Sequence, residues 1–212
     1  MKRKGRFITL EGIEGAGKTT QLAVVRRCLE ARGIGVLTTR EPGGSPIGEG
    51  IRELLLDPAG EGMAADTEVL LLFAARAEHI ARKIRPALAH GTWVLCDRFT
   101  DATYAYQGGG RGVDPERIAV LEDYVQGPLR PDLTLLFDLP AAEGLARAGK
   151  RSAPDRFESE AEPFFEGIRA RYSAIAESHS QRVRLIAADA PVEQVSDQVR
   201  RQVAAFLDSI DP

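Results

Sequence analysis

Residues 12–19 have the types and spacing of a phosphate-binding loop (P-loop). The pattern G-x-x-x-x-G-K-[ST] is filled by Gly12, Ile13, Glu14, Gly15, Ala16, Gly17, Lys18 and Thr19. Its glycines let backbone N–H groups surround a phosphate, and a helix that begins near Lys18 adds positive potential. Lys18 can reach the outer phosphates of a nucleotide, and Thr19 can ligate Mg²⁺. We therefore expect this segment to bind the phosphates of ATP.

A second pair of charged residues follows an apolar segment later in the chain. Residues 93–96 lead directly into Asp97 and Arg98. In an α/β sheet, ligands bind at the carboxyl ends of the strands. Asp97 could hold Mg²⁺ directly or through water, and the planar guanidinium of Arg98 could bind a second phosphate. The two residues alone fit an ion pair that caps the strand at the surface equally well.

Basic residues gather again in a short segment near residue 150. One acid, Asp155, stands there among four bases, which are Arg147, Lys150, Arg151 and Arg156. A basic loop can close over ATP, where its arginines neutralise the transferred phosphoryl group and exclude water. We expect a mobile lid at about residues 147–157. Composition alone would equally allow an ordinary solvated surface loop.

Short apolar runs alternate with longer helical patterns along the chain. Five runs predict strands, at residues 6–11, 35–39, 93–97, 132–138 and 182–187. Between and after them apolar residues recur at helical spacing, as in Leu70, Phe73, Ala77, Ile80 and Ile84. Such repeated units predict an α/β fold, a three-layer doubly wound domain with a five-stranded parallel sheet. Because no linker or internal repeat interrupts them, we expect residues 1–212 to form a single domain.

Composition narrows the classes of function. The chain has 212 residues, with 43% hydrophobic and 28% charged residues, which is typical of a globular protein. Its net charge of −3 argues against non-specific binding to nucleic acid. Cys28 and Cys96 stand far apart without a zinc or disulfide pattern, and no apolar stretch is long enough to span a membrane. We expect a cytoplasmic protein that binds neither nucleic acid nor membranes.

A P-loop alone leaves the acceptor of the phosphoryl group open. Nucleotide switches, motors and small-molecule kinases share this loop. The guanine-binding pattern Asn-Lys-x-Asp is absent, which argues against a GTPase switch. The basic segment late in the chain favours a kinase.

Several further segments resemble one family of P-loop nucleoside monophosphate kinases. They are residues 11–20, 39–44, 52–56, 74–76, 97–98, 105–112, 130–134 and 155–156. Together they resemble the thymidylate kinases, and among them the bacterial type, over nearly the whole chain. The Ala-Tyr-Gln-Gly run at residues 105–108, after an Asp-Arg pair, is specific to this combination. The resemblance implies transfer of the γ-phosphoryl group of ATP to dTMP, giving dTDP and ADP for dTTP biosynthesis.

The resemblance also implies roles in a dTMP site. An arginine at the position of Arg76 hydrogen-bonds the thymine edge, and one at the position of Arg98 holds the acceptor phosphate. Tyr106 would lie near the deoxyribose, where its ring would exclude a ribose hydroxyl by shape. Thr103 would face the N3 edge of the base, with Gln107 assisting.

Three more positions enter the substrate site through the same resemblance. Glu14 corresponds to the residue that binds the 3′ hydroxyl of the sugar, although a loop carboxylate that points into solvent is the simpler alternative. Pro42 and Arg52 match segments that line the substrate site in the family.

The sequence departs from the family pattern at two places. The family often has a stacking phenylalanine four residues before the arginine at position 76, where this chain has Leu72. Phe73 lies three residues before Arg76, on the same helix face, and could contact either the base or the core. Ala102 replaces a serine that is common in the segment after Asp-Arg.

The resemblance implies a catalytic arginine in the lid, because the P-loop carries Glu14 and no arginine. Arg151 is the first candidate and Arg147 the second. The acceptor phosphate is mostly dianionic at neutral pH and needs no general base. Lys18, Arg98, the lid arginines and Mg²⁺ would neutralise the two repelling phosphates. The three histidines, His79, His90 and His179, match no catalytic motif, and we expect them on the surface or in helices.

Two alternative functions remain at this point. One is a kinase for another monophosphate, such as dUMP, UMP or CMP. The other is a nucleotide-binding regulator that uses ATP as a conformational signal. Family resemblance further implies a homodimer, for which the long apolar helix around residues 66–90 is a candidate interface.

Overall fold

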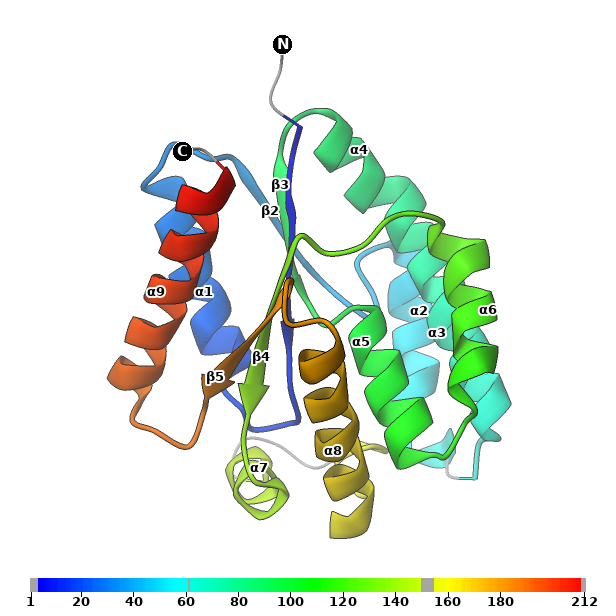
Figure 1. Ribbon diagram of the computed structural model, residues 1–212. Helices are drawn as coiled ribbons and strands as arrows, with labels where there is room; N and C mark the ends of the chain where they lie inside the picture. The colour runs from blue at the N-terminus through cyan, green and yellow to red at the C-terminus, as the bar shows by residue number, and fades with distance from the viewer. Residues whose placement is uncertain (1–3, 61, 150–154, 211–212) are drawn as a thin grey trace.

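Five parallel strands form one sheet in the computed structural model, which describes residues 4–60, 62–149 and 155–210 (Figure 1). The strands are β1 (Phe7–Glu11), β2 (Val36–Arg40), β3 (Trp93–Asp97), β4 (Leu133–Asp138) and β5 (Val183–Ala187). Their order across the sheet is β2-β3-β1-β4-β5. The predicted α/β fold with a five-stranded parallel sheet is confirmed, and each predicted strand end lies within one residue of the observed one.

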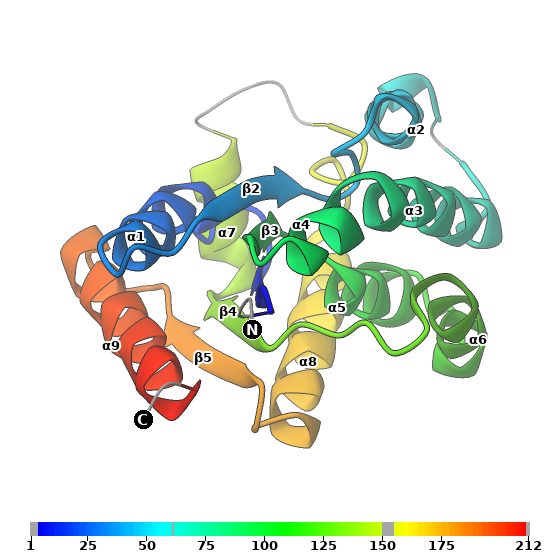
Figure 2. The ribbon, with the colours of Figure 1, turned by 90° about the horizontal axis from the view of Figure 1, so that it is seen from above.

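Helices cover both faces of this sheet and complete three layers (Figures 1 and 2). On one face lie α1 (Lys18–Glu30) and α9 (Val192–Ile210). The opposite face carries α2 (Pro46–Leu56), α3 (Ala65–His79), α4 (Arg85–Ala89), α5 (Thr100–Thr103), α6 (Pro115–Gln126) and α8 (Glu162–Ser178). The remaining short helix, α7 (Ala141–Ala148), lies below the sheet edge in Figure 1. None of the helices in the described part of the chain is long and apolar enough to cross a membrane.

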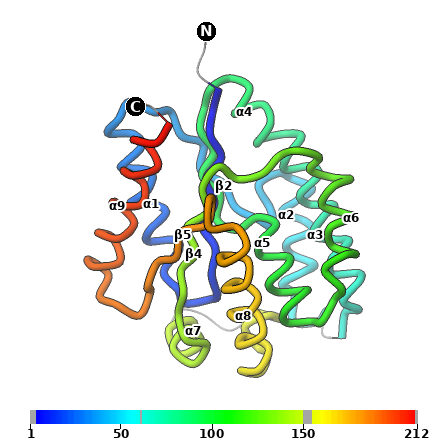
Figure 3. Tube along the Cα trace, in the orientation of Figure 1, coloured from blue at the N-terminus to red at the C-terminus, as the bar shows by residue number. Residues whose placement is uncertain are grey.

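The central strands are buried over their whole length, as expected for a parallel sheet covered on both faces. Every residue of β1 is buried, and so is every residue of β4 except the last, Asp138. Leu10 pairs with Asp97 of β3 on one side and with Leu135 of β4 on the other. This register brings Glu11 and Asp97 to the same edge of the sheet, from which the P-loop leaves (Figure 3).

The apolar face predicted for residues 70–84 is confirmed at three positions and wrong at two. Phe73, Ile80 and Ile84 are buried, whereas Leu70 is 57% exposed and Ala77 is also exposed. The reason is that Arg76 occupies a core-facing position with only 2% of its surface exposed. A pattern built from apolar residues alone assigns such a position to solvent.

Two backbone segments far apart in the sequence touch without intervening side chains. The turn of π-helix at Tyr104–Gly110 lies against α8, and Gly109 faces Gly167 there. A Cβ atom on Gly167 would lie 2.6 Å from the Gly109 carbonyl oxygen. This close approach fixes the position of the segment that carries Tyr106 and Gln107.

Gly167→Ala is therefore expected to lower the free energy of unfolding by about 1–3 kcal/mol, because the two backbones must move apart. Gly50→Ala is the matched control. Gly50 lies in α2 and is exposed, and a Cβ atom added there would meet no other atom within 4 Å, so alanine should stabilise the helix by about 0.5–1 kcal/mol. Urea denaturation of both variants measures the two effects, and equal stabilities would contradict the close-contact argument.

Candidate active site

A cavity of about 260 Å³ opens at the carboxyl edge of the sheet. The expected site residues that line it are Glu14, Gly15, Gly17, Lys18, Thr19, Pro42, Arg52, Arg76, Asp97, Arg98, Thr103, Tyr106 and Gln107. Other expected residues do not line it, namely Gly12, Ile13, Ala16, Phe73 and Arg147. Arg151 lies outside the residues that the structure describes. Segments separated by nearly 100 residues thus meet in one site.

The P-loop has the backbone that its glycines predict. Gly15 and Gly17 have φ values of 73° and 84°, and α1 begins directly after them at Lys18. A Cβ atom on Gly15 would lie 2.2 Å from the carbonyl oxygen of Gly144 in α7. Gly15 is therefore required both by its left-handed backbone and by this contact.

Lys18 lies inside its own loop. Its Nζ donates hydrogen bonds to the carbonyl oxygens of Gly12, at 2.9 Å, and Ile13, at 2.8 Å. Burial, reinforced by the positive charge of Arg98, lowers the pKa of Lys18 to about 8. An anion bound in the loop would favour the charged lysine and raise this pKa again.

Arg98 connects the P-loop to the second half of the cavity. Among the described residues it is the only non-glycine with positive φ, at 67°, and its backbone N–H donates to Leu10 O. Its Nη1 donates to Gly12 O at 2.7 Å, and its Nη2 donates to Glu14 at 2.8 Å. Tyr106 stacks on the guanidinium at 4.8 Å and donates its hydroxyl to Glu14. A strained backbone held in this way is common at functional sites.

A buried carboxylate that the sequence analysis placed only at a strand end supports this cluster. Glu11 accepts hydrogen bonds from the Phe99 N–H and the Tyr172 hydroxyl, both at 2.7 Å. Burial, with a further contribution from the carboxylate of Asp101, raises the pKa of Glu11 to about 8. Tyr172 also lies 3.4 Å from Arg98 Nη1. Tyr172 carries no motif that could have indicated this position.

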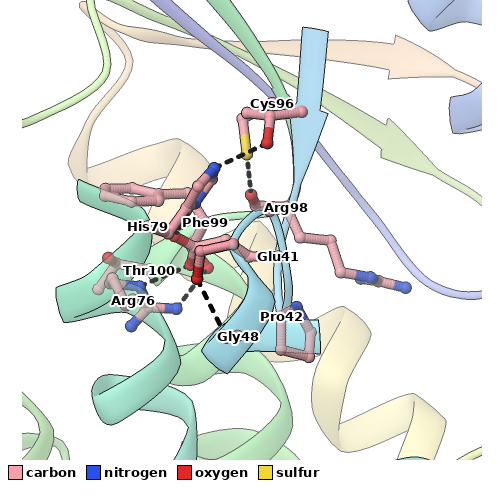
Figure 4. Close-up of polar contacts among 12 residues, drawn as sticks. Glu41, Pro42, Gly48, Arg76, His79, Cys96, Arg98, Phe99 and Thr100 are labelled. Atoms are coloured by element: carbon pink, nitrogen blue, oxygen red, sulfur yellow. Dashed lines mark hydrogen bonds and ion pairs between the residues drawn. The ribbon is translucent and has the colours of Figure 1, made fainter. Parts of the chain in front are cut away.

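Arg76 is the buried cation on the other side of the cavity (Figure 4). Its Nε donates to Glu41 at 2.7 Å, and its Nη2 donates to Thr103 Oγ1 at 3.0 Å and to Phe99 O at 3.3 Å. Its Nη1 is buried and has no hydrogen-bond partner among residues 4–60, 62–149 and 155–210. One donor of this guanidinium is therefore left for a ligand.

Gln107, which also lines the cavity, has an acceptor without a partner among the residues that the structure describes. Its Nε2 donates to the carboxylate of Glu68 at 2.7 Å. Because a carboxylate only accepts, this bond fixes which end of the amide faces Glu68. The buried Oε1 lacks a partner within the described part of the chain. Two residues that line the cavity, Arg76 and Gln107, thus keep one unused donor and one unused acceptor among the described residues.

The two departures from the family pattern have different outcomes. Leu72 lines the cavity, whereas Phe73 is 2% exposed and packs with Val69, Val113 and Ile118 in the core. Phe73 meets the site through Arg76, whose guanidinium lies 4.7 Å from its ring. The expectation that Phe73 lines the substrate site is thus not met, because its position on α3 faces inward. Ala102 lines the cavity and adds no hydroxyl there.

Oxygen ligands for Mg²⁺ are present near the P-loop. Asp97 and Thr19 both line the cavity, and Asp97 Oδ1 is buried without a hydrogen-bond partner in the described ranges. Those ranges hold no group of three His, Cys, Asp or Glu residues that could bind a metal by themselves. This fits Mg²⁺, which takes one or two protein oxygens and completes its shell with water and phosphate.

The two ends of the expected lid are anchored differently. Arg147, at the end of α7, donates to Ala188 O at 3.0 Å and does not line the cavity. Arg156 is buried, donates to Leu55 O at 2.8 Å and forms an ion pair with Glu68 at 2.7 Å. Three residues at that end line the cavity without having been expected there: Asp155, Phe157 and Glu158. The Asp155-Arg156 pair in the sequence was the available signal.

Replacing Glu11 by glutamine (Glu11→Gln) is expected to change how stability depends on pH. The free energy of unfolding of the variant minus that of the unchanged protein should increase as the pH rises from 5.5 to 8. The raised pKa means that the folded state binds more protons than the unfolded state between about pH 4.5 and pH 8, so the protein loses stability as Glu11 ionises. Glutamine is neutral throughout and nearly isosteric. Urea denaturation at both pH values measures the difference.

Glu30→Gln is the control, because Glu30 is exposed on α1 and pairs with Arg26 there. Its effect on stability should change little between the two pH values. An effect of Glu11→Gln that is the same at pH 5.5 and pH 8 would show that the buried carboxyl ionises normally.

Comparison with known proteins identifies the family. A family model described as Thymidylate kinase matches residues 10–199. The thymidylate kinase of Pseudomonas putida is 59% identical over 206 residues, which cover 97% of this chain and 96% of that protein. The thymidylate kinase of Alkalilimnicola ehrlichii is 56% identical, over 96% of this chain and 94% of that protein. A crystal structure of thymidylate kinase from Ehrlichia chaffeensis superposes with a TM-score of 0.75 at 32% identity, covering 97% and 99% of the two chains. The chain belongs to the thymidylate kinase family of ATP-dependent phosphotransferases.

Proposed function

We propose that this protein transfers the γ-phosphoryl group of ATP to dTMP and releases dTDP and ADP, a step of dTTP biosynthesis. The observation that carries the proposal is that two residues lining the cavity each keep a buried polar atom without a partner in the described part of the chain, Arg76 Nη1 and Gln107 Oε1. A thymine edge presents a carbonyl acceptor next to an N–H donor. That alternation complements a donor beside an acceptor.

The same pair of groups argues against cytosine. A cytosine edge presents an amino donor and a ring-nitrogen acceptor, which would place donor against donor at Arg76. A buried hydrogen-bonding group left without a partner costs about 1–3 kcal/mol. Thr103 supports the assignment, because its hydroxyl accepts from Arg76 and keeps its own hydrogen for a ligand.

The sugar and phosphate of the acceptor would lie between the base site and the P-loop. We assign the acceptor phosphate to Arg98 and the 3′ hydroxyl to Glu14, which are 2.8 Å apart here and also meet Tyr106. In this arrangement Glu14 neutralises Arg98. An incoming phosphate would take over the guanidinium and free the carboxylate to accept from the sugar hydroxyl. Pro42 and Arg52 line the same region.

Phosphoryl transfer then requires charge neutralisation and alignment rather than a general base. The acceptor phosphate is mostly dianionic at neutral pH and is itself the nucleophile. Lys18 and Arg98 approach the cavity from the P-loop side and the acceptor side, so they can bind the two anionic groups and hold them in line. Mg²⁺, held through Thr19 and Asp97, would neutralise further phosphate charge.

We assign the lid to residues 147–157, with Arg151 as the catalytic arginine and Arg147 as the alternative. Asp155 and Phe157, at the far end of the lid, line the cavity, so the segment starts from the edge of the site. For Arg147 to act, its hydrogen bond to Ala188 O would have to break. This favours Arg151.

A panel of acceptors tests the function. Purified protein with ATP and Mg²⁺ should release ADP fastest with dTMP, compared with dUMP, dCMP, UMP, dGMP, dAMP and no acceptor. Arg98→Ala should lower kcat/KM for dTMP by roughly 10²–10³-fold, because it removes a charged donor from the phosphate site. Faster turnover with another monophosphate would show a different substrate, and ADP release that no acceptor stimulates would overturn the proposal.

Arg26→Ala serves as the control for Arg98→Ala. Arg26 is exposed on α1 and pairs with Glu30, away from the cavity. Its removal should leave kcat/KM for dTMP unchanged. Unaltered dTMP kinetics in Arg98→Ala would contradict the assignment of the acceptor phosphate to this arginine.

We further propose a homodimer formed through α3 and α6. Leu70 of α3 and Val120 of α6 are 57% and 69% exposed, and Tyr124, one turn after Val120, is 87% exposed. An apolar groove between the two helices is flanked by an ion pair of Asp66 with Arg117. Apolar side chains that gather on one face are typical of a surface covered by a second subunit.

The double variant Val120→Glu, Tyr124→Glu should shift the protein from dimer to monomer in sedimentation equilibrium, because it places four charges in a symmetric interface. Val192→Glu is the control, since Val192 is 57% exposed on α9, which covers the opposite face of the sheet. A double variant that remains dimeric would place the interface elsewhere.

A further inference from the structure

A row of buried polar side chains runs from the sheet to Arg76 (Figure 4). Glu41 follows β2 and is 5% exposed, whereas Arg76 and His79 lie one turn apart on α3 and are 2% and 0% exposed. His79 is thus in a helix, as expected, but not on the surface. Such buried polar groups are costly unless each has a partner.

Glu41 uses one carboxylate oxygen for each of its two partners. Its Oε2 accepts from Arg76 Nε at 2.7 Å, and its Oε1 accepts from His79 Nδ1 at 2.9 Å. The other ring nitrogen, Nε2, lies 2.7 Å from Thr39 Oγ1. Because a carboxylate only accepts, Nδ1 carries a hydrogen, and Nε2 shares the second hydrogen bond with the Thr39 hydroxyl. The histidine is therefore held at both nitrogens.

The turn at residues 42–44 packs directly on the imidazole. A Cβ atom on Gly44, which has a φ of 78°, would lie 2.5 Å from Cδ2 and Nε2 of His79 and 2.8 Å from Thr39 Oγ1. This contact and the two hydrogen bonds leave the ring no room to rotate. Glu41 Oε1 therefore faces a fixed donor.

The hydrogen bond from His79 to Glu41 Oε1 limits how Arg76 can pair with the same carboxylate. A free carboxylate oxygen beside a guanidinium tends to form a second, parallel hydrogen bond. Glu41 Oε1 could pair in this way with Arg76 Nη2, which now donates to Thr103. By occupying Oε1, His79 leaves Nη2 with Thr103. The guanidinium is planar, so the direction of Nη1 is set at the same time.

We propose that His79 is a positioning residue that acts through Glu41 to orient the Arg76 guanidinium, and so contributes to the preference for a base with a carbonyl group opposite Nη1. The proposal rests on the proposed function, in which Arg76 reads the base. It assigns to His79 and Thr39 a role beyond filling the core.

The test is the ratio of kcat/KM for dTMP to kcat/KM for dCMP, measured in one preparation so that the active fraction cancels. His79→Phe keeps a ring of similar size and removes both hydrogen bonds. The ratio should fall by roughly tenfold, within the range expected for a misplaced hydrogen bond to a charged group. KM for dTMP should rise, whereas KM for ATP should stay the same, because none of the side-chain hydrogen bonds of Arg76 and His79 goes to the P-loop.

Thr39 provides an independent pair of variants should His79→Phe fail to fold. Thr39→Val removes the hydroxyl that holds Nε2 and should lower the ratio, whereas Thr39→Ser keeps it and should restore the original value. His90→Phe is the control, since His90 is exposed and its ring bonds only Pro86 O among the described residues. Its ratio should equal that of the unchanged enzyme.

The outcomes separate the two proposals. If the unchanged enzyme prefers dTMP and both His79→Phe and Thr39→Val keep that preference, His79 is a packing residue and this inference is overturned, while the proposed function stands. If the unchanged enzyme does not prefer dTMP, the proposed function fails and this inference fails with it. Equal ratios for Thr39→Val and Thr39→Ser would also contradict the inference.

Discussion

The hydrogen bond from Arg98 to the carbonyl oxygen of Gly12 joins the two halves of the site. Gly12 begins the P-loop and Arg98 follows the neighbouring strand, so the parallel register of β1 and β3 places them together. Arg98 adopts a left-handed backbone there, a conformation that non-glycine residues rarely take. The contact makes the geometry of the P-loop depend on the residue that follows β3.

The strands could be predicted from the sequence to within a residue, because a parallel sheet covered on both faces requires continuous apolar runs. The P-loop and the pair Asp97 and Arg98 were also visible, since their types and spacing carry their chemistry. Residues such as Tyr172 and His79 were not visible. His79 meets Glu41 only because α3 crosses the end of β2, 38 residues away, and no local pattern encodes that crossing.

Arg76 explains why the buried face of α3 was predicted only in part. Helical periodicity treats arginine as an outward residue, so Leu70 and Ala77 were wrongly assigned to the buried face, although Phe73 was assigned to it correctly. In the fold, the charge of Arg76 is balanced by Glu41 and its guanidinium lies against the rings of Phe73 and Phe99. A buried functional cation thus disturbs the apolar pattern at the position where it is most informative.

The two side chains proposed to bind the base are held in the same way. Arg76 is hydrogen-bonded to the buried Glu41 and Gln107 to the buried Glu68, and each keeps a single unused atom within the described part of the chain. A site with fixed, unpaired groups rejects ligands that cannot pair with them. The complex with such a ligand keeps buried polar groups without partners, which weakens its binding. Glu68 also pairs with Arg156, at the far end of the lid. The carboxylate that orients the Gln107 amide therefore also anchors Arg156, so in the proposed function selection of the acceptor and positioning of the lid would depend on the same buried charge.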